Sequence, residues 1–292
     1  MLYWDVFYNS FKGTIDWVIN SILMKVPWYE NYFWGLIIIS IVVWILEIAI
    51  PWRKHQSIIR KDFWMDCFYM FFNFFIFSIL ISGFYSMTEQ LFSSIGYGIS
   101  SIAIIDLSSL SRWAQLLIFF ILLDFVQWIT HVLLHRIDFL WQFHKVHHSV
   151  KEMGFAAHLR YHWMENVLYK PLKTLAVMLM GGFEPAAAFL IHFLSISIGH
   201  LNHANIKITW GPLKYVFNNS VMHLWHHAKN LPSQRRYGVN FGLSLSLWDY
   251  LFRTSYIPNT DGEIPIGFEG DEEFPKTFKN QFIFGFKRIK TK

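Results

Sequence analysis

Four long apolar stretches, separated by polar and turn-rich segments, dominate the pattern along the chain. The first three run over Phe33–Ile50, Phe63–Tyr85 and Trp113–Leu134. Each approaches the roughly 20 residues that a membrane-spanning helix needs. Pro51 ends the first stretch, because proline cannot continue a helix. The pattern therefore predicts three membrane-spanning helices.

The fourth apolar stretch, Val167–Gly199, has an awkward length. Its 33 residues are too many for one spanning helix and too few for two, which would need about 40 residues and a turn. Gly181, Gly182 and Pro185 interrupt it near the middle, and such residues end helices. We predict two short helices that form a hairpin dipping into the bilayer.

Aromatic residues mark both ends of the chain. Residues 1–32 are rich in Trp and Tyr, which favour the headgroup level of a membrane, so we expect an interfacial segment there. The tail from Pro258 is polar and closes on three phenylalanines followed by basic residues, namely Phe282, Phe284, Phe286, Lys287, Arg288, Lys290 and Lys292. This pattern is compatible with an anchor lying on an anionic leaflet and equally with an ordinary solvated tail.

Composition supports the membrane interpretation. Hydrophobic residues make up 54% of the 292 residues and charged residues 15%, against about 25% charged in a typical soluble domain. Cys67 is the only cysteine, which excludes an internal disulfide framework. The net charge of +5 does not indicate nucleic-acid binding, because the basic residues flank apolar segments. The positive-inside rule places residues 51–62 and the chain from residue 135 onward in the cytoplasm.

Histidine is the unusual component, with 14 residues. Three clusters have spacings of three or four residues, which place side chains on one face of a helix. They are His131-x-x-x-His135, His144-x-x-His147-His148 and His223-x-x-His226-His227. His158 with His162, and His200 with His203, form further pairs, whereas His55 and His192 are isolated and are interpreted as ordinary core or surface histidines.

Such clusters indicate a metal site. Neutral imidazole is a good ligand for iron, zinc, copper and nickel, whereas packed imidazoles without a metal would repel one another when protonated. One tetrahedral zinc needs four ligands, so eight clustered histidines predict two metal ions. Asp124 lies seven residues before His131 on the same helix face, and we expect its carboxylate to orient a metal-binding histidine through the ring N–H.

The location of the clusters favours oxidation of a lipid. Iron with open coordination positions activates dioxygen, and a site beside apolar spans suits a substrate that enters from the bilayer. A zincin peptidase is disfavoured because no His-Glu-x-x-His motif occurs. A metal transporter or storage protein, and a zinc-dependent membrane hydrolase, stay open as alternatives, although transporters usually place their ligands at mid-bilayer.

An ordered set of motifs resembles the fatty acid hydroxylase superfamily, also called the sterol desaturase family, and comes nearest to its alkylglycerol monooxygenase-like branch. The motifs span roughly residues 113–256. They are DFVQWITHVLLHR from Asp124, FLWQFHKVHHS from Phe139, LRYH from Leu159, HAN from His203, FNN from Phe217, HLWHH from His223 and LSLWDYLF from Leu245. The resemblance implies an all-α integral membrane protein with a cytoplasmic, histidine-rich di-metal cap.

The resemblance also implies the site and the chemistry. The implied metal ligands are His131, His135, His144, His147, His148, His162, His203, His223, His226 and His227. They would hold two iron ions, with zinc able to replace iron in purified protein, and would hydroxylate or desaturate a lipid with dioxygen. Electrons are expected from a separate transfer partner or a reduced pterin. The implied organisation is an N-terminal part (1–112), a catalytic region (113–256) and a cytoplasmic tail (257–292).

Overall fold

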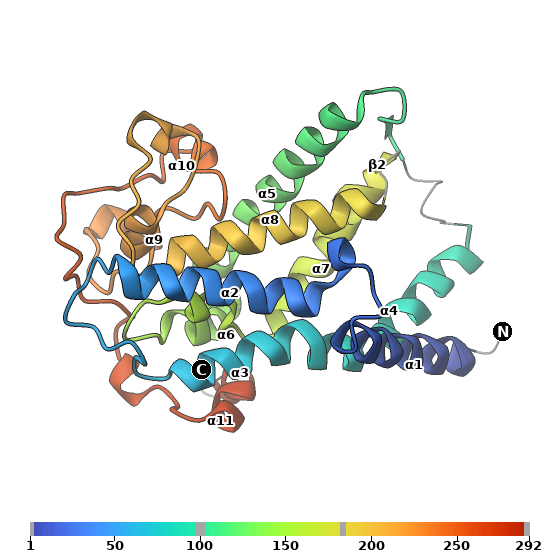
Figure 1. The fold of residues 1–292 in the computed structure, drawn as a ribbon, viewed down its shortest axis with the longest axis horizontal. Coiled ribbons are helices and arrows are strands. Elements are labelled where there is room, and N and C mark those ends of the chain that lie inside the picture. Colours follow the sequence, from blue (N-terminus) through green and yellow to red (C-terminus); the bar gives the residue numbers. More distant parts are fainter. Residues whose placement is uncertain (1–2, 97–102, 182–184, 289–292) are drawn as a thin grey trace.

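A computed structural model describes residues 3–96, 103–181 and 185–288, and in this part of the chain helices predominate (Figure 1). The α-helices are α1 (Tyr3–Ile22), α2 (Tyr32–Ala49), α3 (Phe63–Phe71), α4 (Phe77–Ser94), α5 (Arg112–Arg136), α6 (Asp138–His148), α7 (Trp163–Leu179), α8 (Pro185–His203), α9 (Ser220–His226), α10 (Leu247–Leu251), α11 (Phe278–Phe282) and α12 (Phe284–Arg288). Short 3-10 turns are η1 (Trp28–Glu30), η4 (Phe155–Leu159), η5 (Gly211–Tyr215), η6 (Ser233–Arg235) and η7 (Asp271–Glu273).

The three predicted spans are confirmed as helices long and apolar enough to cross a membrane, at Tyr32–Ala49, Phe63–Ser94 and Arg112–Arg136. The second is longer than expected, because a π-helical turn, η2 (Phe72–Ile76), joins α3 to α4 without a break. Large apolar side chains remain exposed along all three helices. Contiguous exposed apolar surface of this kind marks contact with lipid or a partner.

Two helices, α7 and α8, occupy the fourth apolar stretch as predicted, but they are longer than expected, with 17 and 19 residues. Both pack against α5, and the hairpin dipping into the bilayer stays a prediction. Both extend beyond the apolar stretch, since α7 begins at Trp163 and α8 ends at His203. Gly182, one of the predicted helix-breaking residues, lies outside the described residues. The strand β2 (Met180–Gly181) follows α7 and pairs in parallel with β1 (Ile105–Asp106).

Local signals explain where several helices begin. The side chain of Asn31 accepts a hydrogen bond from Trp34 N at the start of α2, and Ser111 does the same for Ala114 N at the start of α5. Asn219 caps α9. These side chains satisfy the N–H groups that a helix start leaves without partners.

The C-terminal tail packs against the helices, which neither sequence interpretation anticipated. The Phe278 ring lies 4.7 Å from that of Phe68 and 5.1 Å from that of Tyr69, both in α3. Phe286 contacts Phe143 of α6 at 5.1 Å between ring centroids. The aromatic residues of the tail therefore pack against α3 and α6 on one side, while Phe286 stays 40% exposed. Lys290 and Lys292 lie outside the described residues.

The histidine-bearing elements meet at one end of the helical assembly. The C-terminal ends of α5 and α8 point toward the end where α6, α9 and the turn-rich chain after α8 gather (Figure 1). Contacts between α5 and α6, and between α8 and α9, hold these four helices together. The fold thereby brings side chains more than ninety positions apart in the sequence to one place.

Candidate metal centre

Nine buried or nearly buried histidines form two adjacent groups. In each group, one ring nitrogen of every member lies within 4.8 Å of one from every other member. The first group comes from α5, α6 and α9, and the second from α6, α8 and α9 with the residue that follows it. The first is His131, His135, His144, His148 and His226, and the second is His147, His203, His223 and His227.

Ring nitrogens within each group approach one another at 2.9 to 3.3 Å. Nitrogens bound to one metal at about 2.1 Å, and at angles of about 90° to 110°, lie about 3.0 to 3.4 Å apart. The observed spacing is therefore that of neighbouring corners of a coordination polyhedron.

The pair His147 and His203 shows why hydrogen bonding between the rings does not explain this spacing. The Nδ1 of His147 bonds to the carbonyl of Arg160, and that of His203 to the carbonyl of Gly199. A carbonyl oxygen only accepts, so each neutral ring carries its proton on Nδ1 and a lone pair on Nε2. The two Nε2 atoms lie 3.3 Å apart, and a shared cation would turn this repulsive contact into a favourable one.

Other ring nitrogens have no protein partner. His223 Nδ1, His226 Nε2 and His227 Nδ1 are buried without a hydrogen-bond partner in the described part of the chain. Leaving such groups unsatisfied is costly. His226 carries the argument, because its Nδ1 donates to the Val239 carbonyl and leaves the lone pair of its Nε2 for a metal ion. Neutral imidazoles suit iron or zinc.

Burial also keeps these imidazoles neutral. It lowers the pKa of His147 to about 3, with a smaller lowering by the neighbouring His131. Burial, followed by the charges of neighbouring histidines, places the pKa values of His148 and His227 well below the ordinary range. The neutral form is the one that binds a metal ion.

Backbone carbonyls orient several of the rings. His131 Nδ1 lies 2.8 Å from the carbonyl oxygen of Phe241, and His226 Nδ1 lies 2.8 Å from that of Val239. Both carbonyls belong to the loop that follows η6. The loop is thus a structural part of the first histidine group.

Asp124 does not contact a histidine, contrary to the sequence prediction. Its carboxylate accepts hydrogen bonds from Ser244 N, Leu245 N and the indole of Trp248. The facing loop supplies buried N–H groups that need an acceptor, and these occupy the carboxylate. Asp124 therefore shapes the loop after Phe241 and acts on the site only indirectly.

His162 lies outside both groups, also contrary to prediction. Its Nδ1 accepts a hydrogen bond from Met164 N at the start of α7, and its Nε2 donates to the carbonyl of Phe282 in the tail. Both ring nitrogens are occupied, so His162 is a helix cap and a tail contact. His158 and His200 are also outside the groups and face each other, with their Nδ1 atoms 2.8 Å apart.

Two carboxylates support the site without having been predicted. Glu165 lies 3.0 Å from His144 Nδ1 and completes the capping box with His162. Burial raises the pKa of Glu165 to about 8, and the N–H of His162 opposes this shift. Asp249 accepts hydrogen bonds from Phe241 N and from Gly242 N. Two signals in the sequence could have identified them: an acidic residue three positions after His162, and the aspartate of the Leu-Trp-Asp motif.

A buried ionic network supports the second group. The carboxylate of Asp66 forms ion pairs with two guanidinium groups, with Arg60 Nη2 at 2.5 Å and Arg160 Nη1 at 2.9 Å. Asn73, in the π-helical turn, donates to the carbonyls on both sides of Arg160. The Arg160 carbonyl that holds His147 is therefore fixed by contacts to α3 and η2.

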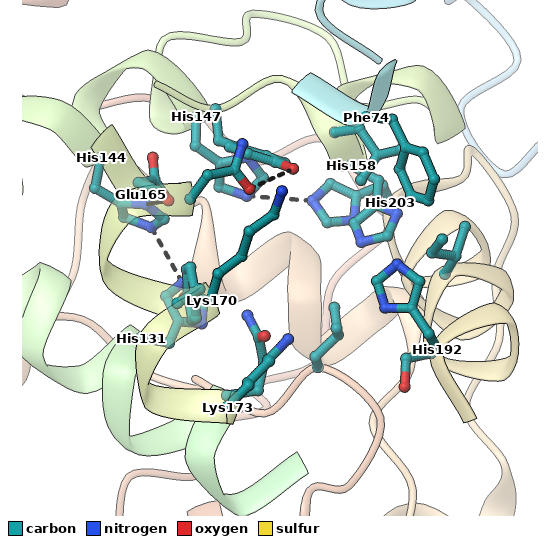
Figure 2. A pocket seen from close by; sticks show the side chains of 18 of the residues that line it. Phe74, His131, His144, His147, His158, Glu165, Lys170, Lys173, His192 and His203 are labelled. Atoms are coloured by element: carbon teal, nitrogen blue, oxygen red, sulfur yellow. Dashed lines mark hydrogen bonds and ion pairs between the residues drawn. The ribbon is translucent and has the colours of Figure 1, made fainter. Parts of the chain in front are cut away.

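A cavity of about 200 Å³ adjoins both histidine groups (Figure 2). His131, His144, His147, His203 and His223 form one part of its lining. The remaining lining comes from η2, η4, α5, α7, α8 and the loop around Leu243. A substrate in this space would lie directly beside the histidines.

Comparison with known proteins agrees with the motifs. The family model for fatty acid hydroxylase matches residues 116–254. An ornithine lipid hydroxylase, OlsE of Rhizobium tropici, is 30% identical over 175 residues, which cover 60% of this chain and 51% of the relative. No solved structure matches the chain.

Two alkylglycerol monooxygenases are also similar. The human protein is 25% identical over 46% of this chain and 29% of its own length. The Danio rerio protein is 27% identical over 83% of this chain and 52% of its own length. The chain therefore spans about half the length, or less, of the curated relatives it matches.

Proposed function

Because the chain resembles the fatty acid hydroxylase superfamily, we propose that it is a membrane-bound non-haem di-iron oxygenase that hydroxylates a lipid. The observation that carries the proposal is the pairing of two groups of buried, neutral imidazoles beside one cavity. The similarity to lipid hydroxylases supports a lipid as substrate.

Each histidine group would hold one metal ion. The five-membered group around His131 and the four-membered group around His147 match the ligand sets expected for two ions. When bound, two iron ions supply the activation of dioxygen and the oxidation of a C–H bond, with electrons from a separate transfer partner or a reduced pterin. Zinc can replace iron in such sites during purification.

The residues of the chain hold and shield this centre. Carbonyls of Phe241 and Arg160 fix the ring orientation of His131 and His147. Phe241, which is nearly fully buried, packs against the rings of His131, His135 and His226 and excludes water from them. Among the described residues, Glu165 is the only carboxylate that hydrogen-bonds to any of the nine rings, and its partner is His144.

The proposed placement follows the charge pattern. The end of the assembly that carries the histidines would face the cytoplasm, together with the basic segment 51–62. Residues 1–112 would form the N-terminal membrane part, 113–256 the catalytic region and 257–292 the tail.

Metal analysis of iron-supplemented protein tests the proposal. We expect about two iron ions per chain, and a lipid product heavier by one oxygen atom. His147→Ala/His226→Ala should lose metal and turnover together, whereas His55→Ala, at an exposed position, should keep both.

Full metal content in the double variant would refute the assignment of the ligands. A lipid product lighter by two hydrogens would instead identify a desaturase on the same site. Turnover that does not consume dioxygen would identify a zinc hydrolase.

A further inference from the structure

Two lysines of α7 line the cavity beside the histidines. Lys170 and Lys173 are three residues apart, so they share one face of the helix. Both side chains belong to the cavity lining, as do His131, His158 and His192 (Figure 2). Lysine is rare in an apolar helical hairpin, and a polar residue there is a candidate for function.

Neither lysine forms a salt bridge with a described residue. The Lys170 ammonium donates to Ser78 Oγ at 3.1 Å and lies 5.9 Å from the ring centre of Tyr85. The Lys173 ammonium lies 5.4 Å from the ring centre of Tyr169. Hydroxyl and aromatic contacts of this kind only partly replace the hydration of an ammonium group.

The nearby carboxylates are engaged elsewhere. Glu165 also lines the cavity, but its two oxygens bond to His144 and to the N–H of His162. Asp124 accepts two hydrogen bonds from the loop around Ser244 and one from the indole of Trp248 in α10. Neither lysine therefore has a carboxylate in direct contact among the described residues, although the charge of Asp124 acts on Lys173 from a distance.

The rest of the lining suits a polar group rather than a hydrocarbon alone. Gln127, Asn166, Ser195 and His192 reach the cavity from α5, α7 and α8. Leu159, Ile196 and Phe74 supply apolar surface on other sides. The mixture fits the junction between the polar end of a lipid and the start of its chain.

We infer that Lys170 and Lys173 form an anion-binding subsite for the phosphate or carboxylate of a lipid substrate. This inference rests on the proposed function and narrows its substrate class to anionic lipids. Because the subsite and the histidines share one small cavity, the polar end of the lipid lies beside the histidine groups. The oxidised position is then near the headgroup and not at the far end of the chain.

Lipid binding tests the subsite independently of turnover. The apparent affinity of the purified full chain in detergent is measured by native mass spectrometry for phosphatidic acid and for diacylglycerol with the same acyl chains. A parallel comparison of oleate with oleyl alcohol covers the carboxylate. The variant Lys170→Gln/Lys173→Gln removes both charges, and Lys170→Arg/Lys173→Arg retains them.

The tail offers a matched control. Lys276→Gln/Lys279→Gln removes two exposed lysines with the same spacing. Metal content equal to that of the wild type shows that each variant is folded at the histidine groups.

We expect the wild type to prefer at least one anionic lipid over its neutral counterpart by at least tenfold. The Gln variant should lose this preference, while the Arg variant and the tail control keep it. An unchanged preference in the Gln variant, or none in the wild type, would overturn the inference. Displacement of phosphatidic acid by equimolar inorganic phosphate would overturn the assignment to a lipid.

The two hypotheses can fail separately. If the protein prefers anionic lipids through these lysines but binds no iron, the proposed oxygenase function is wrong and the anion-binding subsite is still supported. A chain that carries two irons and oxidises a lipid without a lysine-dependent preference would contradict only the subsite.

Discussion

Replacing Asp249 by asparagine should loosen one half of the metal centre selectively. Asp249 is fully buried, and its Oδ1 accepts hydrogen bonds from Trp128 Nε1, Thr254 Oγ1 and Phe241 N. Its Oδ2 accepts from Gly242 N at 2.8 Å. An asparagine that keeps the Oδ1 contacts would turn its NH₂ group toward this N–H, so two donors would face each other.

The magnitude follows from this one lost contact. A hydrogen bond to a charged group contributes about 1.5 to 3 kcal/mol, and an unsatisfied buried donor costs about 1 to 3 kcal/mol. We therefore expect Asp249→Asn to lower the free energy of unfolding by roughly 3 kcal/mol. The N–H of Gly242 and the carbonyl of Phe241 belong to one planar peptide group, so turning this N–H away also moves the carbonyl that orients His131. Losing such a partner weakens metal binding about 10- to 100-fold.

The assay is metal retention during dialysis against a chelator, combined with thermal unfolding. The group around His147 is held by Arg160 and Gly199, which Asp249 does not contact, so the variant should release about one of two metals early. Asp261→Asn, at an exposed carboxylate, is the matched control. Release of both metals at the same rate, or wild-type retention, would refute the proposed link between the loop and the first group.

Three further outcomes follow from the site. Burial lowers the pKa of His147 to about 3, so below about pH 6.5 the unfolded chain binds protons that the folded chain does not. The metal-free protein should therefore become steadily less stable as the pH falls. An unchanged melting temperature by circular dichroism from pH 7 to 4 would disprove this. Asp66→Asn breaks the buried pair with Arg160 and should cost about 3 to 5 kcal/mol in chemical denaturation; a loss below 1 kcal/mol would contradict it. His162→Ala should leave metal content near the wild-type value, whereas His203→Ala should lower it; equal metal loss would restore His162 as a ligand.

The sequence identified the clustered histidines well because their geometry is local. Spacings of three and four residues fix which side chains share a helix face, so His144, His147 and His148 are necessarily neighbours. The sequence did not predict which of these histidines belongs to which of the two groups. His147 joins one group and His148 the other, because consecutive residues of α6 are turned by about 100° around the helix axis. Which group each ring joins depends on how α8 and α9 pack.

The supporting contacts were harder to predict because they are distant and mostly involve the backbone. Any residue can supply a carbonyl, so nothing in the identities of Val239 or Arg160 marks them as partners of His226 or His147. The same limit explains Asp124. Its place on the helix face was correct, but its partners come from a loop 120 residues away, which no periodicity reveals.

The choice of carbonyls over carboxylates has an electrostatic consequence that connects the centre to its cavity. A carbonyl orients an imidazole without adding charge, and five of the nine rings use one in this way, namely His131, His135, His147, His203 and His226. Glu165 supplies the single carboxylate that hydrogen-bonds these rings in the described chain. Two divalent ions would thus keep most of their charge, and Lys170 and Lys173 add to it. In a space of low dielectric this excess attracts an anion strongly. A neutral lipid would leave this excess uncompensated, which is why we infer an anionic substrate for the proposed centre.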